Sequence, residues 1–251
     1  MLYSAFLFSL KYLALILPYL PKFFVIIGAG DHACVLLDML LEQGEKVLGL
    51  ADKAVPKGTV IYGVPVLGDD NEILKYSAED IELVNGIGSV GSLDLRTKMF
   101  EFYKRNGYTF ASVIHSSAII SKRAKLSEGI QVLAGAVINT EVKIADNTII
   151  NTKTSIDHGC NIGKHCHIAP GCTLSGCVTV GNRTHIGTGS SVIQGIKIGS
   201  NVLVGAGSVV IRNIKDNSMI YGVPAKMTDT RNVTGGGNFS YLRLPPGWNA
   251  A

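Results

Sequence analysis

Hydrophobic side chains recur along the second half of the chain with a period of six residues. From Ile114 to Val210 every sixth residue is aliphatic without a gap, which makes seventeen hexads in succession. An α-helix repeats about every 3.6 residues and a half-buried strand repeats every second residue, so neither pattern accounts for this period. A short period sustained over so many repeats is typical of a solenoid, in which each repeat packs on its neighbours.

The hexads share a second inward position. The residue four places after each aliphatic one is small or β-branched, as at Ala136, Thr154 and Cys172, and polar residues or glycine stand between. One hexad therefore predicts a short strand plus a turn, and three hexads predict one triangular coil of 18 residues. Such coils stack by parallel strand pairing. The stretch predicts just under six coils, in which residues 18 apart lie above one another.

The first part of the chain predicts a small α/β domain. A buried strand at Lys22–Ile27 leads into the glycine-rich turn 28–30, which opens an amphipathic helix that ends near Gln43. Further strands are expected at residues 46–51, 82–87 and 108–113, and a second helix at 93–106. The turn favours an anion, because free backbone N–H groups and the helix dipole point at it. The third glycine of the dinucleotide fingerprint is missing, so a plain tight turn stays open as an alternative.

The two ends of the chain differ from the rest. Residues 1–21 are almost wholly apolar and near the length of a membrane span, but Lys11 lies in the middle, where a charge is costly. Three explanations stay open: a membrane-associating helix, the remnant of a fused upstream membrane enzyme, and a mis-assigned start codon. The last two are favoured, because the next strand opens a self-sufficient domain. Residues 228–251 contain a run of three glycines, which predicts a flexible tail. The domains are thus expected at 22–112 and 113–227.

Charge and cysteine content narrow the class of ligand and the compartment. The formal net charge of +4 is too mild to favour nucleic acid, but it suits anionic ligands such as nucleotides. The five cysteines lack the pair spacing of a zinc site. Cys160, Cys166 and Cys172 fall in the inward small-residue position on the three faces of one coil. Plain packing is therefore expected for them rather than a metal or a disulfide, and a reducing cytoplasm is the simplest setting.

The residue pattern of the hexads resembles that of a known protein family. They read aliphatic-Gly-x-x-small-x, as in IGKHCH, IGTGSS and VGAGSV, which resembles the left-handed parallel β-helix of the hexapeptide acyltransferases. The stretch SIDHGCNIGKHCHIAPGCTLSG, the closing GVPAK and the N-terminal GAGDHA resemble nucleotide-sugar N-acetyltransferases that acetylate UDP-4-amino-4,6-dideoxy sugars, and the related sialic-acid O-acetyltransferases. The resemblance covers about residues 22–227. It implies a small Rossmann-like parallel sheet before the β-helix, acetyl-CoA as co-substrate, no metal, and a homotrimer with active sites between subunits.

The stacking rule places His158 between Thr140 and Gly176 in one column at an edge of the prism. On spacing alone a surface imidazole is as good an explanation, but the resemblance makes His158 the catalytic histidine. A sugar amine must shed a proton as it attacks the thioester, and an imidazole titrates in the right range for a general base. The backbone N–H of Gly176 is expected to stabilise the oxyanion. Most relatives follow the histidine with Glu or Asp; here Gly159 follows it, and Asp157 is expected to point elsewhere. Either His158 is then a weaker base, or its orienting group comes from another subunit.

The resemblance also assigns the ligand contacts. Acetyl-CoA would contact His167, Gly176, Thr188, Gly205 and Ala206. The UDP-sugar would be held by Gly30, Asp31, His32, Asp52, Lys53 and Gly88. The position of Asp52 agrees, since an acidic residue about twenty places after the glycine turn suits a ribose or base contact, although a solvated strand end stays open. His165 and His185 are expected to be surface imidazoles.

The expected activity is acetyl transfer to the 4-amino group of a UDP-amino sugar for bacterial surface glycans or protein glycosylation. A sialic-acid-type O-acetyltransferase, with the same base acting on a hydroxyl, stays open. So does a non-catalytic nucleotide-sugar-binding scaffold, which only Gly159 supports. A γ-class carbonic anhydrase needs two histidines five apart at its zinc, but Gly163 and Ser190 stand five places after His158 and His185. The expected location is the cytoplasm, with membrane contact through residues 1–21 as an open alternative.

Overall fold

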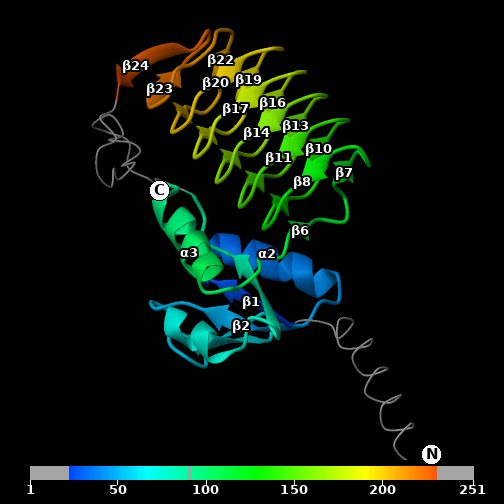
Figure 1. Cartoon of the computed structure of the whole chain (residues 1–251), viewed down its shortest axis with the longest axis vertical. Coiled ribbons are helices and arrows are strands. Elements are labelled where there is room, and N and C mark those ends of the chain that lie inside the picture. Colours follow the sequence, from blue (N-terminus) through cyan, green and yellow to red (C-terminus); the bar gives the residue numbers. More distant parts are fainter. Residues whose placement is uncertain (1–22, 90–91, 231–251) are drawn as a thin grey trace, which may run out of the picture.

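The structure is a computed structural model that describes residues 23–89 and 92–230. A small α/β domain lies at one end of a long three-sided prism of stacked short strands (Figure 1). The predicted fold class, an α/β domain followed by a parallel β-helix, is confirmed. No helix in the described ranges is long and apolar enough to cross a membrane. The predictions for residues 1–21 and for most of the tail fall outside the described residues.

The α/β domain is a five-stranded sheet with helices on both faces. Its strand order is β3 (Val60–Ile61), β4 (Val64–Gly68), β2 (Val47–Ala51), β1 (Phe23–Ile27) and β5 (Ile81–Asn85). Helix α2 (Asp31–Glu42) buries Leu36, Leu37 and Leu40 against one face. Helix α3 (Asp94–Arg105) and the 3₁₀ helix η2 (Asp70–Lys75) pack on the other, through residues such as Phe100, Tyr103 and Ile73.

Three details of this domain differ from the prediction. Strands β3 and β4 and helix η2 were not predicted, and β3 pairs antiparallel with β4. The expected strand at 108–113 is reduced to a single bridge between Leu83 and Phe110. The bridge is formed by the N–H of Leu83, which donates to Thr109, and by the N–H of Ala111, which donates to Leu83, while the N–H of Phe110 donates to the carboxylate of Glu128, 2.8 Å away.

The prism has three faces, which we number in chain order. Face 1 consists of β6 (Val113–Ile114), β9 (Gln131–Val132), β12 (Ile149–Ile150), β15 (His167–Ile168), β18 (His185–Ile186), β21 (Leu203–Val204) and β23 (Ser218–Tyr221). Face 2 consists of β7 (Ile119–Ile120), β10 (Val137–Ile138), β13 (Ser155–Ile156), β16 (Thr173–Leu174), β19 (Ser191–Val192) and β22 (Val209–Val210). Face 3 consists of β8 (Lys125–Leu126), β11 (Lys143–Ile144), β14 (Asn161–Ile162), β17 (Thr179–Val180) and β20 (Lys197–Ile198). The turns between them form corners 1/2, 2/3 and 3/1.

Stacking follows the predicted 18-residue rule. Ile138, Ile156 and Leu174 pair in register on neighbouring strands of face 2, and their side chains point into a continuous apolar core. From Gly129 to Gly207 every turn contains one residue with a left-handed backbone, which explains the glycines at these positions. At the far end β24 (Lys226–Thr230) pairs antiparallel with β23. A strand therefore occupies the first three residues of the region expected to be a flexible tail.

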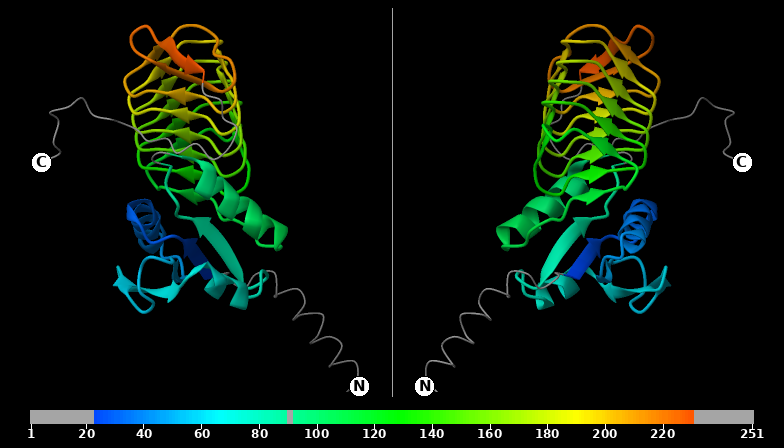
Figure 2. Two further views of the ribbon diagram at one scale, coloured as in Figure 1. Left: turned by 90° about the vertical axis from the view of Figure 1, so that its left-hand side faces the viewer. Right: turned by 90° about the vertical axis from the view of Figure 1, so that its right-hand side faces the viewer.

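The α/β domain is packed firmly against face 1. Leu133 and Ile149 of face 1 share a buried cluster with the side chains of α2. The amide of Gln131 donates to the backbone oxygen of Asn85 at the end of β5, 2.7 Å away. Figure 2 shows α3 crossing between this domain and the base of the prism. The carboxyl ends of β1 and β5 therefore meet the prism.

Candidate active site

His158 lies at corner 2/3, on the turn between β13 and β14, and 59% of its side chain is exposed. Its Nδ1 is 3.1 Å from Oδ1 of Asp157, and its backbone N–H donates to the same oxygen over 2.7 Å. The expectation that Asp157 points elsewhere is wrong, because this backbone N–H and the amide of Asn139, 3.0 Å away, hold the carboxylate beside the ring. Hydrogen bonds from His158 keep the pKa of Asp157 below its ordinary value. A carboxylate at Nδ1 favours a proton there, which leaves Nε2 as the acceptor.

Gly176 lies one coil above His158, directly over its ring. A Cβ atom built on Gly176 would stand 2.6 Å from Cε1 and 2.7 Å from Nε2 of the imidazole, so only glycine leaves room for the ring. The backbone oxygen of Gly176 accepts the N–H of Gly195. Among the described residues, no hydrogen-bond acceptor meets the N–H of Gly176. This N–H is therefore free to donate to a ligand beside His158.

Gly159 follows the histidine in the left-handed backbone region, with φ at +67°. The residues one coil below and above, Glu141 and Cys177, have φ at +60° without being glycine, so the position itself tolerates a side chain. The missing carboxylate at residue 159 is thus not imposed by the backbone. The carboxylate that does contact the ring is that of Asp157, on the other side of His158.

The sugar-binding residues expected in the α/β domain gather at the carboxyl ends of β1, β2 and β5. Gly30 and Asp31 form the exposed start of α2. A Cβ atom built on Gly88, just beyond β5, would stand 3.5 Å from Cβ of His32. The sheet order changes direction between β1 and β5, with α2 on one face and α3 on the other. Ligands of open α/β sheets bind at such a switch point.

Asp52 connects β2 to the glycine turn. Its carboxylate accepts the backbone N–H of Ala29 over 2.8 Å and that of Ala54 over 2.7 Å. Lys53 beside it is exposed. Each carboxylate oxygen can accept a further hydrogen bond, but the contacts present give Asp52 a structural role in addition to any contact with a ligand.

His167 lies on face 1, buried beneath the loop that follows β5. Nδ2 of Asn151 donates to its Nε2 over 2.9 Å, since Oδ1 of that amide already accepts the N–H of Thr152. Nδ1 of His167 is in a short contact with the hydroxyl of Ser89. Burial holds the pKa of His167 well below its ordinary value, so the ring is neutral. Nδ1 then carries the proton, and both ring nitrogens already have partners.

Arg96 underlies this loop and is fully buried. Its Nη1 donates to the backbone oxygens of Asn85 and Ile87, over 2.7 and 2.8 Å, which fixes the turn that carries Gly88. Burial lowers the pKa of Arg96 to about 9, and its charge assists burial in lowering the pKa of His32 to about 4. His32 is therefore neutral, and its Nε2 is 2.8 Å from the side-chain oxygen of Gln131. The sequence analysis missed Arg96, Ser89 and Gln131 as site residues. The available signals were that Ser89 follows Gly88 in the sequence and that Gln131 lies two coils below His167 on face 1.

One chain does not bring the expected acetyl-CoA contacts together. His158 and Gly176 lie at corner 2/3, whereas His167 lies on face 1 on the opposite side of the prism. Thr188 follows β18 at corner 1/2, and its backbone oxygen accepts the N–H of Gly207 one coil above. Gly205 and Ala206 occupy this same corner, after β21. The candidate site thus consists of two separate halves.

Comparison with known proteins identifies the family. A model described as the PglD N-terminal domain matches residues 24–102, and one described as the bacterial transferase hexapeptide, six repeats, matches residues 141–176. Perosamine N-acetyltransferase from Caulobacter crescentus, solved with CoA and GDP-perosamine, is 37% identical over 82% of this chain and 96% of its own, with a TM-score of 0.76. The chain belongs to the hexapeptide-repeat nucleotide-sugar acetyltransferase family. As a member of it, the chain is an acyltransferase.

Two further structures resemble this nucleotide-sugar acetyltransferase. The acetyltransferase domain of PglB from Neisseria gonorrhoeae FA1090, solved with acetyl coenzyme A, is 30% identical over 82% of this chain and 99% of its own, with a TM-score of 0.77. WeeI from Acinetobacter baumannii AYE is 21% identical over 82% of this chain and all of its own, with a TM-score of 0.75. The second likeness shows the fold alone. The left-handed β-helix is the fold of this family.

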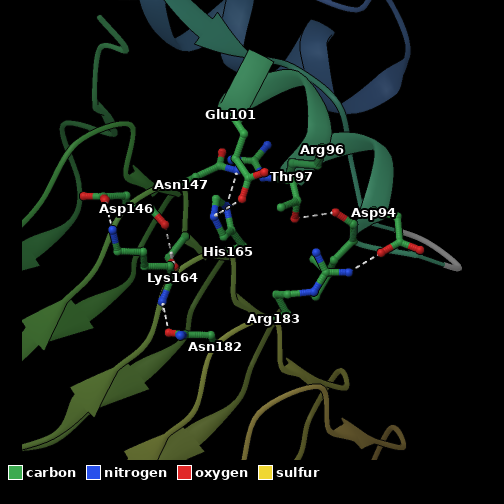
Figure 3. Close-up of polar contacts among 12 residues, drawn as sticks. Asp94, Arg96, Thr97, Glu101, Asp146, Asn147, Lys164, His165, Asn182 and Arg183 are labelled. Carbon is green, nitrogen blue, oxygen red and sulfur yellow. Dashed lines mark hydrogen bonds and ion pairs between the residues drawn. The ribbon is translucent and has the colours of Figure 1, made fainter. Parts of the chain in front are cut away.

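Two further histidines of the acetyltransferase are not the surface imidazoles that were expected. His165 is buried at corner 3/1, where Figure 3 shows it between Asn147 of the prism and Glu101 of α3. Nδ2 of Asn147 donates to its Nδ1 over 2.9 Å, and burial lowers the pKa of His165 to about 4. His185 is half-buried and packs edge-on against His167, with ring centroids 4.8 Å apart. Helix α3 of the α/β domain, which hexad spacing does not reveal, accounts for the burial of His165.

The cysteines at the inward positions of the acetyltransferase are packing residues. Cys160, Cys166 and Cys172 are fully buried, and each thiol contacts a backbone oxygen in the coil above, at 3.1 to 3.2 Å. Burial raises the pKa of Cys160 to about 11. A thiol of this pKa is protonated at neutral pH, and the thiolate is the nucleophilic form. Cys160 is therefore suited to packing rather than to nucleophilic attack.

Proposed function

We propose that this acyltransferase moves the acetyl group of acetyl-CoA to the 4-amino group of a UDP-linked 4-amino-4,6-dideoxy sugar. The observation that carries the proposal is the arrangement at corner 2/3, where Asp157, the His158 ring and the free N–H of Gly176 lie together. The ligands of two relatives support both substrates. The Caulobacter enzyme was solved with CoA and GDP-perosamine, and the Neisseria domain with acetyl coenzyme A.

The geometry supports direct transfer in one site. The amine nitrogen attacks the thioester carbon while Nε2 of His158 accepts a proton from it, and Asp157 steadies the imidazolium at Nδ1. The carbonyl oxygen becomes an oxyanion that the N–H of Gly176 can meet. Collapse of the intermediate breaks the carbon–sulfur bond, and the proton on His158 passes to the sulfur of CoA. No step needs an acyl-cysteine.

The nucleotide sugar is assigned to the carboxyl ends of β1, β2 and β5. The glycine turn and the start of α2 offer backbone N–H groups to an anion. His32 and Gly88 border the same crevice. UDP is our first candidate for the nucleotide. GDP is the second, because the relative with 37% identity was solved with GDP-perosamine.

We infer further that the active enzyme is a homotrimer whose sites form between copies. Face 1 is covered by the α/β domain and face 3 carries Lys125, Lys143 and Lys197, whereas face 2 presents small or apolar side chains outward. Ile119 on face 2 is 67% exposed. Three copies with face 2 turned inward would set corner 2/3 of one copy against corner 1/2 of the next. That contact would unite the two halves of the site in a closed ring.

The substrate proposal is tested by mass spectrometry of mixtures that contain the protein, acetyl-CoA and a panel of UDP- and GDP-linked amino sugars. A product heavier by one acetyl group supports it, and the panel identifies the nucleotide. Sialic acids in the same panel test the O-acetyltransferase alternative. Binding of a nucleotide sugar without any product would favour a scaffold instead.

The assembly is tested by mixing two inactive variants, His158→Ala at corner 2/3 and Ala206→Glu at corner 1/2. If each site takes one corner from each of two copies, random reassembly gives roughly a quarter of sites with both corners intact. Activity should then return to about that fraction. Mixtures that stay inactive after confirmed subunit exchange would place both corners in the same site of one copy.

A further inference from the structure

A basic hollow lies beside His158 and has no part in the mechanism proposed above. It has a volume of about 510 Å³ and is lined by Arg123, Lys125, Glu141, Lys143, Gly159 and Asn161. These residues come from corner 2/3 and the adjoining edge of face 3, in three successive coils. Gly159 is the immediate neighbour of His158, so the hollow opens next to the candidate base.

The cations of this hollow have no carboxylate partner within residues 23–89 and 92–230. Among the described residues, Arg123, Lys125 and Lys143 make no ion pair, although Lys57, Lys75, Lys104, Lys164 and Arg183 all do. Three cations and the carboxylate of Glu141 leave a formal charge of +2. Lys125 and Lys143 also stack in register on neighbouring strands, where like charges oppose each other. An anion of two or more charges would relieve this repulsion.

The hollow lies on the side of His158 that faces the α/β domain. Arg123 and Lys125 belong to the coil nearest that domain, Glu141 and Lys143 to the next, and His158 to the third. The α/β domain sits at this same end of the prism (Figure 2). In the ring proposed above, corner 2/3 of one copy meets the side of its neighbour that carries face 1 and the α/β domain. A nucleotide held there, with its sugar at His158, would pass its diphosphate along the hollow.

The α/β domain offers few cations of its own to such a diphosphate. Arg96 is fully buried and its Nη1 is engaged by backbone oxygens. Lys53 is exposed at the end of β2. We therefore propose that Arg123, Lys125 and Lys143 of one copy bind the diphosphate of the nucleotide sugar held by the α/β domain of the next. This inference rests on the proposed function and deepens it, since residues of two copies would bind each nucleotide.

The test compares Lys143→Gln and Lys125→Gln with Lys197→Gln, a control in the same lysine column of face 3 but farther from the α/β domain. UDP and GDP are titrated calorimetrically into each full-length protein. The KM values for acetyl-CoA and for the accepted nucleotide sugar are measured beside them. Loss of one charge-assisted contact should weaken nucleotide binding and raise the KM of the nucleotide sugar about tenfold, with the KM of acetyl-CoA unchanged. Lys197→Gln should resemble the unaltered protein.

Glu141→Gln should have the opposite effect on nucleotide affinity. It removes the one carboxylate of the hollow, so nucleotide binding should become tighter. Unchanged nucleotide affinity in all three hollow variants, in a protein that still acetylates, would overturn the inference and leave the proposed function intact. A raised KM for acetyl-CoA instead would assign the hollow to the phosphates of CoA and also overturn it. Absence of both nucleotide binding and acetylation in the unaltered protein would contradict the proposed function itself.

Discussion

Corner 2/3 and face 1 of the prism carry the same residue type in opposite surroundings. His158 at corner 2/3 is largely exposed and has one carboxylate for a partner. His32 and His167, at the junction of face 1 with the α/β domain, are held neutral by burial, which lowers their pKa values. A base must gain and lose a proton in each turnover, whereas a buried neutral imidazole serves as a fixed donor or acceptor. The comparison supports the proposal that proton transfer occurs at the corner and that the histidines of the junction position the ligands.

The sharpest test of this division is His158→Ala. General-base assistance is typically worth about 10²- to 10⁴-fold, so kcat should fall by that factor while both KM values change little. Part of the loss should return at high pH, where solution supplies the free amine. Because the side chain is exposed, stability should change by less than about 0.5 kcal/mol. Steady-state kinetics and thermal melts measure both, with His115→Ala on the first coil as a control. Near-normal kcat at neutral pH would remove His158 from the mechanism.

Gly176→Ala tests the corner without touching an ionisable group. The added methyl would stand 2.6 Å from Cε1 of His158 and push the ring away from Asp157. A small misplacement of a catalytic group can cost about 10²-fold in rate, so kcat should fall about 10- to 100-fold. Gly195→Ala is a control on the next coil, at the position that stacks over Cys177 rather than over Gly176; a Cβ there meets nothing within 4 Å, and φ is +72°. Equal losses in the two variants would mean that the backbone, rather than the imidazole, causes the effect.

The sequence predicted the β-helix better than the α/β domain. The aliphatic period sets which residues point inward, and Ile138, Ile156 and Leu174 stack as expected. Strands β3 and β4 were not predicted, because they are short and because residues 60–68 show no sustained hydrophobic period. In the β-helix each strand has a neighbour one coil away, so a repeated local pattern determines the pairing.

The candidate site was predictable only in part. Stacking by 18 residues placed Gly176 over His158, as the structure shows. The position of Asp157 was missed, although the same 18-residue rule places Asn139, whose amide donates to the Asp157 carboxylate, directly below it. The burial of His165 was not predictable, since α3 covers it and lies some 60 residues earlier in the chain. Side-chain partners across domains are not encoded in a local period.

His165→Asn tests the buried environment through the pH dependence of stability. The pKa of His165 is about 4 in the folded state against about 6.5 when unfolded, so the unfolded state binds more protons between these values. The free energy of unfolding therefore falls as pH drops from 6.5 to 4, by up to about 3 kcal/mol from this group.

Asn suits the left-handed backbone at residue 165, where φ is +56°. The variant should lose some stability at pH 7 through its contact with Phe100, but it should lose less than the unaltered protein on acidification. Urea unfolding at several pH values measures the difference. Glu101, Lys164 and Arg183 also face this group, so a parallel fall in both proteins would assign the acid sensitivity to them.

Cys160→Ala gives the smallest expected effect and separates packing from chemistry at corner 2/3. Cys160 lies two residues after His158, yet its side chain points into the core and its thiol contacts the backbone oxygen of Ser175 over 3.2 Å. Truncating a small buried side chain costs about 1 kcal/mol, and kcat should stay substantially unchanged. Cys166→Ala is the matched control, because that thiol occupies the same inward position at corner 3/1 and should cost as much stability. If only Cys160→Ala lost activity, or if mass spectrometry trapped an acetyl-thioester on Cys160, the direct transfer from acetyl-CoA to the amine would be replaced by a two-step route.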